Sequence, residues 1–302
     1  MEIRIPEDCN GMLLRTYLTR CLALSSKMIK HIKFLPNGIE VNGEPKTVRY
    51  LLRTGDLLSL ALEDTESAPI LPIELPIEIL YEDPDLVVPA KPADMPTHPS
   101  CDHYNDTVAN ALAFRYAQSG TPFVFRPINR LDRNTSGLLL IARNRPTAAT
   151  LTKSMQKGEI RKQYLAVLDG EMTQREGRID ACLHRTAESI ILREVCAPDA
   201  LDAAPSLTEY RVLAVGQGHT LVQASPITGR THQLRVHFAS IGHPITGDDL
   251  YGTPDTRIAR HALHAHRLSF PHPKTNETVS LTAPLPADLA DLIAYLFPNI
   301  TL

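Results

Sequence analysis

Long apolar runs are absent from this chain of 302 residues. No run approaches the roughly 20 apolar residues that a helix needs to cross a bilayer, so a membrane-spanning helix is excluded. The opening residues, MEIRIPEDCNGM, contain no apolar stretch of the signal-peptide kind. We therefore expect no secretory signal and a cytoplasmic location. Hydrophobic residues make up 43% and charged residues 22%, which is typical of a globular chain that can bury a core.

Cysteine is scarce, and the five cysteines lie far apart without a CxxC pair. They are Cys9, Cys21, Cys101, Cys182 and Cys196. This spacing excludes a disulfide framework and a cysteine-based zinc site, so we interpret them as scattered reduced thiols. Histidines cluster more closely, but no nearby carboxylate completes a ligand set. They are His232, His237, His261, His264 and His266. We expect neither a metal nor a cofactor.

A strong net charge is also missing, since the whole chain carries only −3. The charge is unevenly distributed. Residues 11–53 contain eight basic and two acidic side chains, which gives +6 for this segment and −9 for the rest. A basic segment on an acidic remainder is typical of a protein that binds a polyanion. The alternative is a solvated basic surface without a ligand.

The N-terminal part of the chain has the pattern of a small α/β module. Apolar side chains recur at helical spacing over residues 11–24. They are Leu13, Leu14, Tyr17, Leu18 and Leu22. Ser25 fits the N-cap of a second helix over residues 26–34. Strands are expected over residues 39–41 and 57–62, with a turn at Asn42-Gly43.

Residues 63–72 are acidic and contain proline, which indicates a linker. We expect domains over residues 1–65 and 74–302. In the second domain, strands are predicted around the turn at residues 83–85 and over 138–142, 163–168, 206–215 and 219–224. One helix is predicted to run to Gln118 from a cap at Asp106 or Thr107, and another from Pro146, after a cap at Asn144, to before Gly158. Further helices are predicted over 230–241 and 285–296. Strands outnumber helices without regular alternation, so the fold class is α+β.

One polar turn stands out, the segment RLDRNTSG at residues 130–137. Its carboxylate, Asp132, lies between Arg130 and Arg133, and a continuous apolar run follows at once. Neighbouring positive charge keeps a carboxylate ionised, and a loop mounted on a rigid strand holds it in place. The alternative is an Asx turn in which Asp132 binds backbone N–H groups.

Five segments in series resemble the RluA-type pseudouridine synthases. They are ILYEDPDLVVPAKPADMPTHP, RLDRNTSGLLLIAR, KQYLA, SPITGRTHQLRVHFASIGHPITGDDLYG and LHAHRLSFPHP. Together they span roughly residues 77–273, and a collinear series is far more specific than one short motif. Asp94 stands where a glycine is common in that family.

The resemblance implies isomerisation of uridine to pseudouridine in RNA, without redox change or metal. Asp132 would be the essential carboxylate, which attacks C1′ or removes the C2′ proton. Tyr164 would lie against the base, and Arg235 would pair with Asp132. Leu234 would help to wall a dry site for a flipped uracil. Arg130 and Arg133 would contact the RNA backbone. We expect a mainly antiparallel mixed sheet with the site in a cleft across it.

The N-terminal module resembles the S4 RNA-binding domain through SSKMIKHIK, IEVNG and RTGDLLSL. The resemblance implies RNA contacts by Lys27, Lys30 and Lys33. A structured RNA is then the expected partner, ribosomal RNA first and transfer RNA second, and we expect a monomer. Two other classes remain as alternatives. One is a non-catalytic RNA-binding or ribosome-assembly factor, and the other is a glycoside hydrolase, which needs a second acidic residue.

Overall fold

The structure is a computed structural model, and it describes residues 2–22, 24, 29, 32–33, 35, 37–61, 70–100, 102–189 and 191–300. The chain divides into two compact units, Met1–Pro69 and Ile70–Leu302. Within the described residues, no helix has the length and apolar character needed to cross a membrane. Each unit is described by itself below.

The N-terminal unit contains a four-stranded antiparallel sheet with strand order β1-β4-β2-β3. Its strands are β1 (Glu2–Arg4), β2 (Ile39–Val41), β3 (Glu44–Pro45) and β4 (Leu57–Leu60), and a short 3-10 helix, η1 (Glu7–Cys9), follows β1. The β2–β3 turn has φ values of 54° at Asn42 and 79° at Gly43. Positive φ at both central residues is what a tight hairpin turn requires, so the predicted turn is confirmed.

A helical segment packs on this sheet, starting as α1 (Leu14–Thr16) and continuing as a π-helical turn, η2 (Tyr17–Cys21). Leu14, Tyr17 and Leu18 are buried in the core of the unit, which confirms the predicted apolar face. Leu13 does not belong to this buried face, because it is 45% exposed. The second predicted helix lies largely outside the described residues, and Lys27 and Lys30 lie outside them too. Lys33 is described and exposed.

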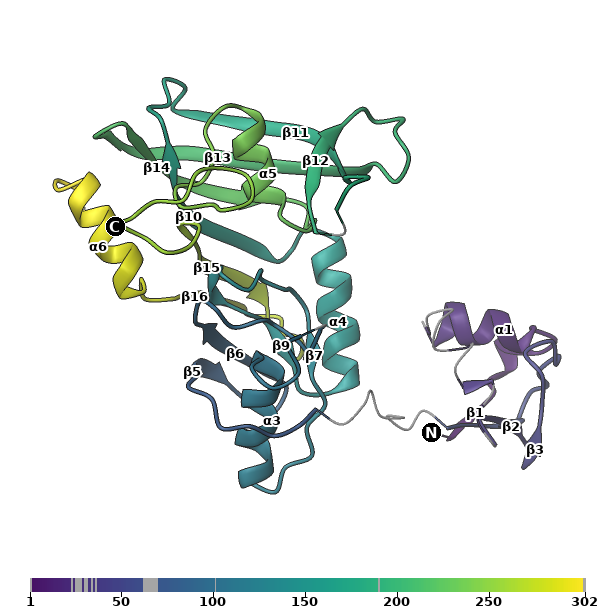
Figure 1. Ribbon diagram of the computed structural model, residues 1–302. Helices are drawn as coiled ribbons and strands as arrows, with labels where there is room; N and C mark the ends of the chain where they lie inside the picture. The colour runs from purple at the N-terminus through teal and green to yellow at the C-terminus, as the bar shows by residue number, and fades with distance from the viewer. Residues whose placement is uncertain are drawn as a thin grey trace. The chain divides into compact units, whose positions relative to one another are not determined.

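The C-terminal unit is built on a twelve-stranded sheet (Figure 1). The main path is β12-β11-β13-β14-β10-β15-β8-β6-β9-β7, with β16 beside β15 and β5 beside β6. Its strands are β5 (Glu78–Glu82), β6 (Leu86–Lys91), β7 (Arg126–Pro127), β8 (Ser136–Leu138), β9 (Ile141–Ala142), β10 (Arg161–Asp169), β11 (Glu176–Arg185), β12 (Arg193–Cys196), β13 (Ala204–Gly216), β14 (His219–Pro226), β15 (Leu263–Pro271) and β16 (Thr278–Thr282). Among the described strands, the pairing of β15 with β8 is parallel and the others are antiparallel. The predicted α+β class with a mainly antiparallel mixed sheet is confirmed.

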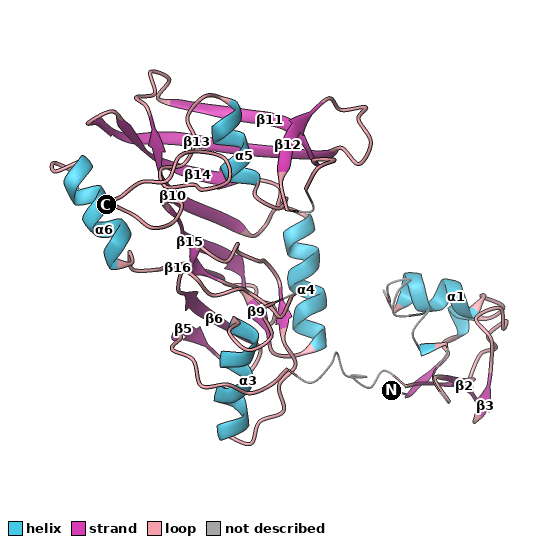
Figure 2. Cartoon of the chain, viewed as in Figure 1, coloured by secondary structure: helices cyan, strands magenta, loops and turns pink. Residues whose placement is uncertain are grey.

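Few helices accompany this sheet (Figure 2). They are α3 (Val108–Gln118), α4 (Arg145–Gln156), α5 (Gln233–Ser240) and α6 (Ala287–Leu296). Thr107 caps α3 by accepting a hydrogen bond from the Asn110 N–H, and Asn144 caps α4 in the same way through Thr147. Side-chain oxygens at these positions satisfy donors that a helix start leaves unpaired, so both predicted caps are confirmed.

The apolar run at residues 138–142 is buried as predicted, but it is two strand pieces rather than one. β8 and β9 both pair with β6, and the ladder is interrupted opposite Pro89. Proline has no N–H, so a regular ladder cannot continue through it. Alternate residues of the run enter two different apolar clusters. A strand buried on both faces is apolar throughout, which explains the continuous pattern.

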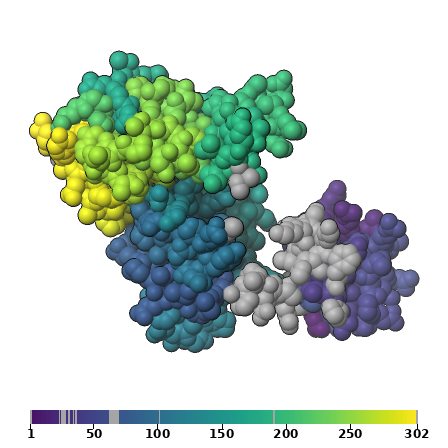
Figure 3. Space-filling view, viewed as in Figure 1, coloured from purple at the N-terminus to yellow at the C-terminus, as the bar shows by residue number. Residues whose placement is uncertain are grey.

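Gly137 in β8 permits the parallel contact with β15. Its φ is 114°, and a Cβ atom there would lie 2.3 Å from the backbone oxygen of Ala265. Only glycine combines this backbone conformation with so close an approach. The strand that follows the Asp132 turn is therefore held directly against β15. In the space-filling view, this blue to teal part of the unit adjoins the green part that carries β11 to β14 (Figure 3).

Candidate active site

A cleft of about 660 Å³ collects side chains from three segments that are distant in sequence. They are the turn at residues 127–135, strand β10 and the segment 226–235 that leads into α5. Asp132, Tyr164, Leu234 and Arg235 all line this cleft. Asp132 is the one carboxylate among the described residues that line it. The structure brings these four predicted site residues together in one cleft.

The turn that carries Asp132 is fixed through its main chain. Thr97 Oγ1 donates to the Leu131 carbonyl at 2.9 Å and accepts from the Leu131 N–H at 3.2 Å. The Thr135 N–H donates to the Asp132 carbonyl oxygen at 3.1 Å. The Asp132 carboxylate makes no hydrogen bond to the described residues, and its side chain is 26% exposed. The Asx-turn alternative is therefore wrong, and the carboxylate is available to a substrate.

A buried lysine also holds the Asp132 turn in place through hydrogen bonds to main-chain carbonyls. Lys91 Nζ donates to the carbonyls of Pro92, Met95 and Arg133, each at 2.7 Å. The residue is 1% exposed, and burial lowers its pKa to about 7, although the negative charge of Asp132 acts in the opposite direction. Three carbonyl acceptors use all three donors of an ammonium group. Lys91 thus joins the end of β6 to the Asp132 turn.

Arg235 reaches Asp132, but its main partner is another carboxylate. The distance from Arg235 Nη1 to Asp132 Oδ2 is 3.9 Å. Arg235 Nε and Nη2 donate to the two oxygens of Asp248 at 2.7 Å each. The expected role of Arg235 as a direct partner of Asp132 is therefore corrected to one that is shared. Asp248 forms the strong bidentate pair with Nε and Nη2, and the remaining nitrogen, Nη1, is the one that lies near Asp132.

The Arg235–Asp248 pair is deeply buried. Burial alone would lower the pKa of Arg235, but the hydrogen bonds and charge of Asp248 raise it. Burial would likewise raise the pKa of Asp248, and Arg235 lowers it. Asp248 also accepts the N–H groups of Leu250 and Tyr251, and the Tyr251 ring lies 5.1 Å from the Arg235 guanidinium. Both groups stay charged, so a fixed positive charge stands beside Asp132.

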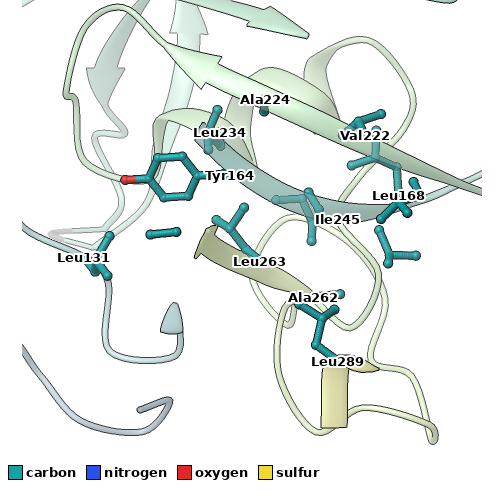
Figure 4. Packing of buried hydrophobic residues seen from close by; sticks show 14 of the residues in the cluster. Leu131, Tyr164, Leu168, Val222, Ala224, Leu234, Ile245, Ala262, Leu263 and Leu289 are labelled. Carbon is teal, nitrogen blue, oxygen red and sulfur yellow. The ribbon is translucent and has the colours of Figure 1, made fainter. Parts of the chain in front are cut away.

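Tyr164 lies on β10 at the end of the main apolar cluster. Figure 4 shows its ring between Leu131 and Leu234, with the hydroxyl at the end of the ring that points away from Leu234. The residue is 7% exposed. Burial, and then the negative charge of Asp132, raise the pKa of its hydroxyl. Tyr164 therefore presents a neutral phenol close to Asp132, with a face on which a base can stack.

The two arginines of the turn have different surroundings. Arg130 lines the cleft and donates to Thr231 Oγ1 on the opposite segment. Arg133 does not line the cleft, and it pairs with Asp94 at 2.6 Å. Asp94 has a φ of 60°, so it adopts the left-handed conformation that suits the glycine common at this position in the family. Of the two predicted RNA contacts, only Arg130 belongs to this site.

Sequence reasoning missed several residues of the site. His98 and Lys162 line the cleft, and burial lowers the pKa of each. Asp248 and Lys91 lie behind it. The signals available were weak. Lys162 stands two residues before Tyr164, the spacing of side chains that share one face of a regular strand. Lys91 is a charged residue at the end of an otherwise apolar strand.

One group of possible metal ligands occurs among the described residues, Asp83, Asp85 and His272. None of them lines the cleft. Asp83 already accepts from His272 at 2.9 Å, and Asp85 accepts from Lys274 at 2.7 Å. These contacts satisfy the carboxylates without an ion, so the group has an ordinary structural explanation.

Comparison with known proteins shows where this arrangement belongs. A family model for RNA pseudouridylate synthase matches residues 85–240, a stretch that includes Asp132, Tyr164 and Arg235. The chain belongs to the RNA pseudouridylate synthase family. A pseudouridine synthase is an isomerase that converts uridine to pseudouridine in RNA, so the predicted family and activity are confirmed.

Individual relatives agree with the family match. The uncharacterized RNA pseudouridine synthase YjbO of Bacillus subtilis is 38% identical over 90% of this chain and 95% of that protein. The ribosomal large subunit pseudouridine synthase D of Nitrosomonas europaea is 30% identical over 97% of this chain and 87% of that protein. A solved structure, human RNA pseudouridylate synthase domain containing 1, has a TM-score of 0.59 and 30% identity, and covers 70% of this chain and 84% of that chain.

Proposed function

We propose that this pseudouridine synthase isomerises uridine in ribosomal RNA, with Asp132 as the catalytic carboxylate. The observation that carries the assignment is that Asp132 is the one carboxylate among the described cleft-lining residues and has no hydrogen bond to them. Relatives named ribosomal large subunit pseudouridine synthase support the RNA class. Transfer RNA remains the second candidate substrate.

The reaction balances with the residues present. The C1′–N1 bond breaks and its electron pair leaves with N1 of uracil, while Asp132 attacks C1′ or takes the C2′ proton. The uracil rotates and C5 forms the new bond to C1′ as the Asp132–C1′ bond breaks or as the proton returns to C2′. C5 then loses its proton to solvent and N1 takes one up, so the product is an isomer of the substrate. Arg235 places a positive charge 3.9 Å from the Asp132 carboxylate. The apolar walls from Leu131, Leu234 and Tyr164 exclude the water that would otherwise hydrolyse the sugar.

The target base must leave its stack before it can enter the cleft, at a cost of a few kcal/mol. Arg130 stands at the cleft, where it can bind the displaced backbone. We propose that the N-terminal unit is an S4-like RNA-binding domain over residues 1–65, preceding a catalytic domain over 74–302. Lys27, Lys30 and Lys33 would contribute phosphate contacts there. The working oligomeric state is a monomer.

Neither rival function fits the cleft as well. A glycoside hydrolase of the usual type needs a second carboxyl group roughly 5–10 Å from the first. No other carboxylate lines the described cleft. A non-catalytic RNA-binding factor has no need of a solvent-accessible carboxylate held beside a buried arginine.

Tritium release from [5-³H]uridine-labelled ribosomal RNA tests the proposal directly. Wild type should release tritium, and Asp132→Asn should release none above background while still binding the RNA in a filter assay. Equal release by both proteins would remove Asp132 from its proposed role. If wild type released tritium from transfer RNA but not from ribosomal RNA, the proposed substrate class would change and the proposed role of Asp132 would stand.

A further inference from the structure

His232 adopts an unusual backbone conformation at the edge of the cleft. Its φ is 57° and its ψ is 17°, in the left-handed region that non-glycine residues rarely occupy. Such a conformation costs of order 1–3 kcal/mol and persists only where the surroundings fix it. Here the His232 carbonyl accepts the Val236 N–H at 2.9 Å in the first turn of α5. The conformation directs the His232 side chain to the cleft, which it lines.

The segment before His232 is held by a buried side chain. Gln233 Oε1 accepts from Thr228 Oγ1 at 2.7 Å and from the Arg230 N–H at 3.0 Å. Gln233 Nε2 donates to the Leu207 carbonyl at 2.9 Å. The imidazole therefore stands on a rigid support, which is where a group that touches substrate has to be placed.

The tautomer that lets the Tyr251 hydroxyl both accept and donate a hydrogen bond has the His232 proton on Nε2. The Tyr251 hydroxyl oxygen accepts the Arg193 N–H at 3.0 Å, and it lies 2.7 Å from His232 Nδ1. In this tautomer the hydroxyl donates its one proton to His232 Nδ1, the acceptor 2.7 Å away. A neutral imidazole that accepts at Nδ1 carries its proton on Nε2.

His232 Nε2 makes no hydrogen bond to the described residues. Burial lowers the pKa of His232 below its usual range, although the nearby Asp132 carboxylate acts in the opposite direction. The ring is thus neutral at neutral pH. A neutral N–H group beside Asp132 donates without forming an ion pair that would occupy the carboxylate.

Two arginines of the cleft already donate to other protein groups. Arg235 gives two of its arms to Asp248, and Arg130 donates to Thr231. When the C1′–N1 bond breaks, the electron pair on N1 spreads onto O2 and O4 of uracil. O2 is bonded to the carbon next to N1, so it lies close to C1′. His232 lines the same cleft as the carboxylate that acts at the ribose, so its free N–H group can serve O2.

We propose that the Nε2–H group of His232 donates a hydrogen bond to O2 of the target uracil and stabilises the charge that develops there as the glycosidic bond breaks. The inference rests on the proposed function of Asp132 in the same cleft. A donor aimed at developing charge in a dry site acts on the rate more than on binding, and removing one costs about 10²–10³ in rate. His232 is then a catalytic residue of this isomerase.

Two substitutions of His232 distinguish a hydrogen-bond donor from a general base and from a residue with only a structural role. In His232→Gln, the amide N–H group replaces Nε2–H, but glutamine cannot act as a base. In His232→Asn, the shorter amide reaches only the Nδ1 position, and asparagine tolerates left-handed backbone well. Single-turnover tritium release from [5-³H]uridine-labelled ribosomal RNA should fall about 100-fold in His232→Asn and less than about 10-fold in His232→Gln. RNA affinity should stay within about threefold in both, because the donor acts on the transition state.

The result that overturns the proposal is a His232→Asn rate close to wild type, or a His232→Gln rate as low as that of His232→Asn. Silence of wild type itself would overturn the proposed function, and this inference with it. The accepting oxygen is tested with a synthetic RNA that carries 2-thiouridine at the mapped target, because sulfur is a weak acceptor. The thio substitution should slow wild type and leave His232→Asn unchanged. Equal slowing of both proteins would show that O2 is not the acceptor.

Discussion

At the scale of single residues, the position of Arg235 in the site depends on Asp248, a side chain that does not line the cleft. Asp248 is 0% exposed and binds Arg235 through both oxygens, so it decides where the guanidinium stands relative to Asp132. Asp249 is the next residue, is 65% exposed and lies 3.5 Å from the same guanidinium. These two neighbours share a residue type and a partner but differ in burial.

Asp248→Asn should therefore harm the enzyme far more than Asp249→Asn. Breaking a buried ion pair leaves an uncompensated charge, so we expect the free energy of unfolding to fall by about 3 kcal/mol. Misplacement of Arg235 should lower single-turnover tritium release roughly 100-fold. Asp249→Asn should change the free energy of unfolding by less than about 0.5 kcal/mol. Urea denaturation and tritium release measure both, and equal effects of the two variants would refute this account of the pair.

Sequence reasoning reached Asp132, Tyr164 and Arg235 because each stands in a motif of its own. It could not predict the Asp248–Arg235 ion pair, because Asp248 is one of several aspartates in the same loop and nothing in the sequence marks it as the partner. It considered His232 only as a metal ligand. The left-handed backbone and the Tyr251 hydrogen bond that give His232 another role are products of tertiary contacts.

At the scale of elements, the parallel pairing of β15 with β8 places buried histidines behind the Asp132 turn. His264 pairs in register with Ser136, and its Nδ1 lies 2.9 Å from Ser136 Oγ. His261 Nε2 lies 2.8 Å from Thr135 Oγ1. Burial lowers the pKa of His264 to about 4 and that of His261 to about 3. Both rings must therefore stay neutral in the folded protein.

These histidines should make the folded protein sensitive to acid. The pKa of His264 is lower when folded than when unfolded, so protonation favours the unfolded chain. Its stabilising contribution is present above about pH 6.5 and is lost as the pH falls toward the folded value of about 4. At pH 5 this loss amounts to about 2 kcal/mol for one histidine. His264→Asn keeps a partner for Ser136 but does not titrate, so its unfolding free energy should fall less between pH 7.5 and pH 5. Parallel losses in the two proteins would contradict this role of His264.

The elements that the sequence predicted well were those with a local signal. Thr107 and Asn144 cap their helices as expected, and Asn42-Gly43 forms the expected turn. Strands β11 and β12 were not predicted. Their side chains are mostly partly exposed, as in the pattern eieBeiiBie for β11, so no apolar alternation marks them. Their pairing with each other and with β13 is what makes them strands.

At the scale of the whole molecule, the uneven charge predicts separate tasks for the two units. The basic segment at residues 11–53 lies within the unit Met1–Pro69, and the cleft lies within Ile70–Leu302. Phosphate contacts release counterions, so RNA affinity should fall steeply with salt.

Removal of residues 1–69 should weaken this salt dependence. Each lost phosphate contact lowers the slope of log K against log[salt] by about 0.7–0.9, so we expect a decrease of about 2 or more. The remaining unit has its own apolar core and should retain Asp132-dependent tritium release at low salt. Filter binding of ribosomal RNA at several salt concentrations gives the slope. An unchanged slope would remove the N-terminal unit from RNA binding.

The sequence by itself determined the fold class and the family, and it singled out the carboxylate that lines the cleft. Each of these can be inferred from local sequence patterns or from the collinear series of motifs. The tertiary structure alone decided the partners: Lys91 under the Asp132 turn, Asp248 behind Arg235, and Tyr251 against His232. These contacts join residues of different elements, and their distances depend on how the sheet brings β6, β10, β15 and α5 together. Burial and these partners together then set the charge of each group, and both are properties of the folded chain.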